Sequence, residues 1–80
     1  MILNSSILAR IDHYKTRKDL ILKGMRLNIE RAAAKRDLIL GDETVEFVYL
    51  LQDEHGTWRS SRVGVASHVK ITIEREAEHA

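Results

Sequence analysis

The chain has 80 residues, with 13 Lys or Arg, 12 Asp or Glu and no cysteine, and its formal net charge is +1 at pH 7. A chain of this length forms one domain with a small core, and the lack of cysteine excludes disulfides and thiolate metal sites. No apolar run reaches the roughly 18 residues of a membrane-spanning helix, and the N-terminus lacks the basic-then-apolar order of a secretory signal. We therefore expect a cytoplasmic protein.

An amphipathic helical pattern dominates the first half of the chain. Ile21, Met25 and Ile29 recur at the 3.6-residue period of one helix face, which predicts a stripe that packs on a core. The pattern extends back to the potential capping residues 4–6 and forward to Gly41, a residue type that commonly ends helices. We expect helical structure over residues 5–40, as one helix or as a helix bent or split near residue 16.

A second apolar stripe lies on another side of the predicted helix. It contains Leu20, Leu27 and Leu38, and a helix with two apolar stripes needs two partners. We expect the second partner to be another copy of the chain, which makes these leucines candidate homodimer contacts. The alternatives are that they form the edge of one wide core face, or that residues 1–12 fold back over them.

The second half of the chain has the pattern of a β-meander. Residues 44–52 are rich in β-branched and aromatic side chains and are apolar on both faces, which is typical of an interior strand. Residues 53–56 predict a turn, residues 57–65 a second strand and residues 69–74 a third strand with strict alternation. The predicted fold is a single α+β domain, α-β-β-β, in which a long N-terminal helix packs on a three-stranded antiparallel meander over residues 44–75, followed by a frayed tail over residues 76–80.

The charges divide unevenly between the two halves. Residues 1–40 carry nine basic and four acidic side chains, whereas residues 41–80 carry four basic and eight acidic ones. Such a division is consistent with a nucleic-acid surface on the basic half, and equally with attraction between the two halves within or between chains.

No pattern of catalytic or metal-binding residues is present. The four histidines, at positions 13, 55, 68 and 79, do not form an i, i+4 pair with another ligand on one helix face. The two adjacent serines, at positions 60 and 61, have no nucleophile-elbow context. We expect neither an enzyme nor a metal or other cofactor.

By elimination, the sequence favours a small non-enzymatic protein-binding module that acts as a regulator, adaptor or inhibitor. The candidate partner-binding residues are Trp58, Tyr49, Arg59 and Arg62, because aromatic and arginine side chains supply most interface energy. The alternative is a nucleic-acid-binding protein, in which basic side chains neutralise phosphates beside an exposed tryptophan. Its candidate residues, with Trp58, are Arg17, Lys18, Lys35, Arg36, Arg59, Arg62 and Lys70.

Overall fold

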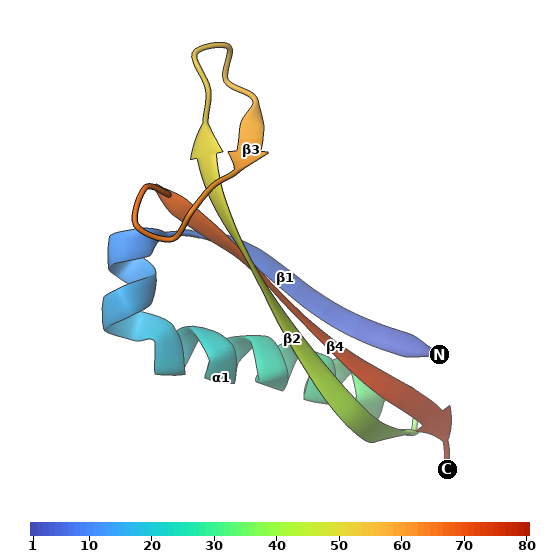
Figure 1. The fold of residues 1–80 in the computed structure, drawn as a ribbon. Helices are drawn as coiled ribbons and strands as arrows, with labels where there is room; N and C mark the ends of the chain where they lie inside the picture. Colours follow the sequence, from blue (N-terminus) through green and yellow to red (C-terminus); the bar gives the residue numbers. More distant parts are fainter.

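The computed structural model describes residues 1–80 and contains one helix and four strands in the order β-α-β-β-β. The elements are strand β1 (Ile2–Arg10), helix α1 (Ile11–Lys35) and strands β2 (Leu38–Gln52), β3 (Trp58–Ser60) and β4 (His68–His79). The strands form one antiparallel sheet in the order β1-β4-β2-β3, and α1 lies along one face of it (Figure 1). The predicted α+β class is confirmed, with four strands in place of three. The last three strands are not in the predicted meander order, because β2 lies between β3 and β4 and pairs with both.

Strand β1 is the largest departure from the sequence prediction, which placed a helix from residue 5 onward. The segment pairs with β4 in unbroken register, from Ile2 opposite Glu76 to Arg10 opposite His68. The isoleucines at positions 7 and 11 have a spacing that suits a helix, but alternate residues of the same segment also suit a strand. Pairing with β4 decides between the two, because β-structure depends on neighbours that are distant in sequence.

Helix α1 begins at Ile11 and bends sharply at Arg17, whose backbone angles (φ −126°, ψ 16°) are not helical (Figure 1). Of the two alternatives that the sequence leaves open, the helix bent near residue 16 is the one found. The hydroxyl of Thr16 donates to the carbonyl oxygens of Asp12 (3.2 Å) and His13 (3.1 Å) instead of capping the following segment. Side-chain bonds back to the preceding turn are known to bend helices.

The core lies between α1 and the three longer strands. Met25 and Ile29 are each 2% exposed, and Ile21 packs against the same cluster, so the predicted core stripe of the helix is confirmed. Each large apolar side chain buried in this way contributes roughly 1.5–3 kcal/mol. The opposing residues, all fully buried on the central strand β4, are Val69, Ile71 and Ile73.

The helix ends at Lys35, earlier than the sequence predicts. Asp37 has a left-handed backbone (φ +53°) and starts the turn into β2. Gly41 is therefore not the helix-ending residue; it lies in β2, where an added Cβ would be 3.4 Å from the Cβ of Glu76. The strand register shifts between Leu40 and Glu43, beside this glycine.

The remaining strands also differ in extent from the prediction. The predicted second strand, residues 57–65, is reduced to the three residues of β3, and the following seven residues form a connection. The predicted frayed tail is largely strand, because β4 continues to His79. Reciprocal backbone bonds between Met1 and Ala77, at 3.0 and 2.9 Å, hold this end of β4 against β1.

Candidate functional site on the open face of the sheet

The sheet face opposite α1 has no covering element, and we call it the open face (Figure 1). Strand alternation places on it the residues whose neighbours point into the core, such as Leu8, Val48 and Lys70. A hollow of about 550 Å³ lies on this face. It is lined by Ser6, Ile7, Leu8, Glu46, Val48, Leu50, Trp58, Lys70 and Thr72.

The hollow is mainly apolar although it faces solvent. Leu8 on β1 is 48% exposed and Trp58 on β3 is 38% exposed, while Val48 and Leu50 of β2 lie half-buried between them. Val48, Leu50 and Trp58 form an apolar group on β2 and β3, and Lys70 of β4 lies between this group and Leu8 on β1. A contiguous exposed apolar patch with a polar rim marks an interaction site more often than scattered single residues do.

Trp58 is held at one side of the hollow by two contacts. Its backbone pairs with Gln52 of β2, and its ring lies edge-on against the ring of His68 on β4, with centroids 4.8 Å apart and an interplanar angle of 74°. The edge-to-face arrangement is a favourable geometry for aromatic rings. The indole is therefore presented to solvent in a fixed orientation.

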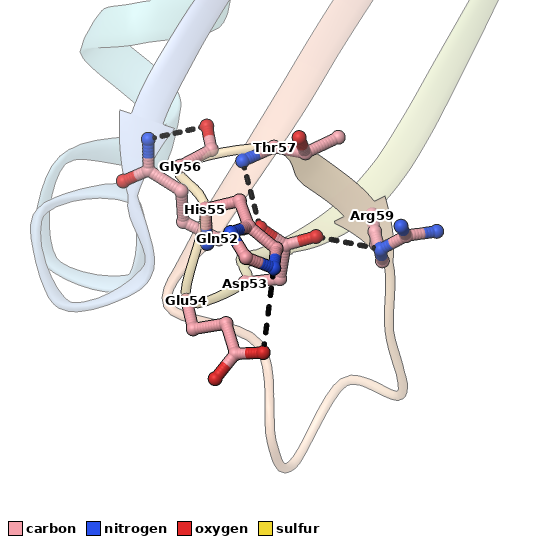
Figure 2. A network of polar contacts seen from close by, with 7 residues as sticks. All are labelled: Gln52, Asp53, Glu54, His55, Gly56, Thr57 and Arg59. Carbon is pink, nitrogen blue, oxygen red and sulfur yellow. Dashed lines mark hydrogen bonds and ion pairs between the residues drawn. The ribbon is translucent and has the colours of Figure 1, made fainter.

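The β2–β3 turn organises the short strand that carries Trp58 (Figure 2). One carboxylate oxygen of Asp53 accepts the backbone N–H groups of His55 and Thr57, both at 2.9 Å. Its other oxygen accepts Nε of Arg59 at 2.8 Å. These hydrogen bonds lower the pKa of the Asp53 carboxyl, and the bond from Arg59 has the largest effect. Hydrogen bonds to the charged form of a carboxyl group favour its ionisation. Gly56 completes the turn with φ +82°, a conformation that favours glycine.

The four predicted partner-binding residues do not lie on one surface. Trp58 is on the open face, whereas Tyr49 pairs with Val69 and is half-buried on the helix side of the sheet. Arg59 projects to the side opposite Trp58 because adjacent strand residues alternate, and its guanidinium is bound to Asp53. Arg62 lies exposed in the connection between β3 and β4.

The predicted nucleic-acid residues are also divided between surfaces. Lys70 and Trp58 line the hollow on the open face. The four basic helix residues, Arg17, Lys18, Lys35 and Arg36, belong to α1 and its C-terminal cap on the other side of the sheet. The open face itself carries Glu46 and Glu74 beside the lysine, since Glu74 alternates with the buried strand residues of β4.

The predicted dimer stripe is shorter than expected. Leu20 and Leu27 lie on the exposed side of α1, 61% and 37% exposed. Leu38 is not on the helix: it is the first residue of β2 and is 8% exposed in the core. It cannot contact a second chain alongside the other two, and its assignment to the dimer stripe is corrected.

Several residues of the hollow were not identified as functional from the sequence, among them Leu8, Val48 and Leu50, and neither was His68, which contacts Trp58. One signal was available, because β2 is apolar on both faces and Val48 and Leu50 form its second apolar face. That pattern predicted an interior strand, and β2 is interior over part of its length. The open side is uncovered because the chain has only one helix for two sheet faces.

No cluster of metal-binding side chains and no carboxyl group with a shifted pKa lines this hollow. No three His, Asp or Glu side chains lie close enough together to hold a metal ion. The carboxyl groups whose pKa is lowered, Asp12, Glu43 and Asp53, all lie outside the hollow. The helix is too polar along its length to cross a membrane.

Comparison with protein-family models, with curated proteins and with solved structures found no match for the chain.

Proposed function

We propose that the protein is a small binding module that docks another protein on its open face and acts as a regulator, adaptor or inhibitor. The observation that carries the proposal is the uncovered apolar hollow with Trp58 on its wall. Tryptophan is among the side chains that most often dominate the binding energy of an interface. The partner group that fits is an apolar side chain, since the hollow is lined mainly by apolar groups.

The charges in the hollow favour a protein over a polyanion. Lys70 and Glu46 both line it, so it presents both signs of charge. Mixed charge suits the polar rim of a protein interface, whereas binding to a phosphate backbone depends on a surface of one sign.

Nucleic-acid binding remains the alternative proposal, supported by the basic side chains of α1 and by Trp58 beside Lys70. These two groups lie on opposite sides of the sheet, so one strand of nucleic acid cannot use both at once. Binding to a random single-stranded or duplex oligonucleotide at low salt tests this alternative, because phosphate contacts are strongest there.

We also propose that the chain forms a homodimer through the side of α1 that carries Leu20 and Leu27, beside β1. Leu20 and Leu27 supply its apolar contacts, and an exposure of 61% for Leu20 is high for so large an apolar side chain. Light scattering tests this proposal, with twice the chain mass expected for the wild type and a single chain mass for Leu27→Asp. A wild-type monomer at high concentration contradicts it.

The binding function is tested by capture from an extract of the source cell. The wild-type chain should retain a defined protein, and Leu8→Asp should lose it because a charge then enters the hollow. The matched control is Val63→Asp, which makes the same kind of change at a residue that is 56% exposed and outside the hollow. A captured set that does not change with Leu8→Asp contradicts the proposal.

A further inference from the structure

A second surface of the molecule, at the edge of the sheet formed by β1, has not been assigned a role. Met1 and Ala77 exchange both backbone bonds, and Ile11 donates its N–H to Ser67. Antiparallel ladders alternate, so the odd-numbered residues of β1 face β4 and the even-numbered ones face outward. The outward backbone groups belong to Ile2, Asn4, Ser6 and Leu8.

This edge lacks the features that normally block strand pairing. Residues 2–9 contain no charged residue and no proline, whereas natural sheets protect their edges with charges, prolines, bulges or short strands. The opposite edge is protected in this way. There β2 has an irregularity between Leu40 and Glu43, carries several acidic side chains and is partly covered by β3.

A groove runs beside the open edge, between β1 and α1. It has a volume of about 330 Å³. Its buried and half-buried lining residues include Ile7, Ile21 and Met25, and Gly24 leaves it open because nothing lies within 4 Å of the position where a Cβ would be. The exposed Leu20 and Leu27 also line it, so the homodimer proposed above and a bound segment would compete for this surface. An extended segment added to β1 would direct every second side chain into this groove.

The charge around the groove is basic. Arg31 lines it, and Lys35 follows one turn later on the same side of the helix. Neither side chain takes part in an ion pair, and no acidic residue lines the groove. A segment that fills the groove would therefore complement its charge if the segment carried acidic side chains.

We infer that the β1 edge binds an extended, acidic segment of a partner protein, which joins the sheet as a fifth strand and places apolar side chains in the groove. A second copy of β1 is a poorer occupant. Two-fold pairing of β1 with itself would bring two sets of Arg31 and Lys35 together, and β1 supplies no acidic residue to offset them. This inference rests on the proposed binding function and deepens it. It uses the outward backbone of β1 and the groove beside α1, whereas the open-face proposal uses the side chains of Leu8 and Trp58.

The test uses two synthetic ten-residue peptides in which every second residue is threonine. The positions between the threonines, which share one face of an added strand, alternate valine with glutamate in one peptide and valine with lysine in the other. Fluorescence anisotropy of the labelled peptides measures affinity for the whole chain. We expect the acidic peptide to bind and the basic one to bind at least about tenfold more weakly, because matched charge selects between partners. Equal binding of the two peptides, or no binding of the acidic one, overturns the inference.

Two variants locate the binding. Asn4→Pro removes an outward N–H without removing a bond to β4, since proline is tolerated on edge strands, and Arg31→Glu reverses the charge of the groove. Both variants should lower the affinity for the acidic peptide about tenfold or more, while the circular dichroism spectrum of the protein stays unchanged. The control Lys23→Glu makes the same charge change on α1 outside the groove and should retain binding.

The remaining outcomes separate other occupants from the one proposed. If Trp58→Ala abolishes peptide binding and Asn4→Pro does not, the peptide lies on the open face and the edge inference fails alone. If an oligonucleotide displaces the peptide and Asn4→Pro has no effect, the basic side chains bind polyanions without strand pairing. If light scattering shows a dimer that Asn4→Pro dissociates, the edge belongs to a second copy.

Discussion

The ring of Trp58 on β3 rests edge-on against the ring of His68 on β4, 4.8 Å away between centroids, across the intervening strand β2. Because Leu50 pairs with Ser60 on one side and with His68 on the other, the contact spans the full width of β2. It ties the shortest strand to the central strand of the sheet and orients the indole on the open face.

His68→Ala should release Trp58. Loss of an edge contact between rings lowers the free energy of unfolding by about 0.5–1.5 kcal/mol, and the indole should become more mobile and more hydrated. Trp58 is the only tryptophan, so its fluorescence emission should shift to longer wavelength with faster acrylamide quenching. An unchanged spectrum would show that the contact does not hold the indole.

Asp53→Asn should loosen the β2–β3 turn, because a neutral amide loses the ionic bond to Arg59. The pKa of Asp53 is lowered in the folded chain, so its carboxylate stabilises the fold above the unfolded value and the contribution is lost as pH falls through the folded value. The transition is expected below the ordinary aspartate pKa of 3.8.

The measurement is acrylamide quenching of Trp58 fluorescence as the pH is lowered from 5 to roughly 2. The wild type should show a transition in quenching that Asp53→Asn lacks. The same transition in both proteins would assign it to another carboxyl group.

Ile71→Ala should be the most damaging of single core changes. Ile71 is fully buried on the central strand, and truncation of such a side chain costs about 2–5 kcal/mol through lost contacts and the cavity left behind. Since small domains are only marginally stable, urea unfolding should show a large loss. The milder Ile71→Val should cost roughly 0.5–1.5 kcal/mol, and equal midpoints for the two variants would contradict the described core.

Asp37→Gly should stabilise the chain. Asp37 holds a left-handed backbone (φ +53°) between α1 and β2, and its side chain forms no hydrogen bond or ion pair. Glycine adopts this conformation without a steric penalty, so we expect a gain of about 1 kcal/mol, or roughly 4–8 °C in Tm for a domain of this size. Asp37→Ala is the control and should not be stabilising, because alanine has the same backbone restriction.

The sequence predicted the parts of the fold that depend on local pattern. The Met25 and Ile29 stripe, the bend near Thr16 and the turn that ends at Gly56 all result from short-range periodicity or from turn chemistry. The strict alternation after Val69 likewise identified β4.

The parts that depend on distant pairing could not be read in the same way. β1 was assigned to the helix because Ile7 and Ile11 match its period, and only pairing with β4 shows otherwise. That error hid the open edge of the sheet. Leu38 was placed on the helix for another reason, because the sequence predicts a helix end at Gly41 whereas α1 ends at Lys35. The hollow was hidden for a related reason, since the sequence indicates that β2 is apolar on both faces but not that one face lacks a cover.

The central claim is that the open face docks a protein, and titration of Trp58 fluorescence with the captured partner tests it most directly. We predict a saturable change in indole emission for the wild type, with binding about 30-fold weaker for Leu8→Asp, equivalent to roughly 2 kcal/mol, and unchanged for Val63→Asp. A partner that binds without altering the emission of Trp58, and with equal affinity for Leu8→Asp, would contradict the claim.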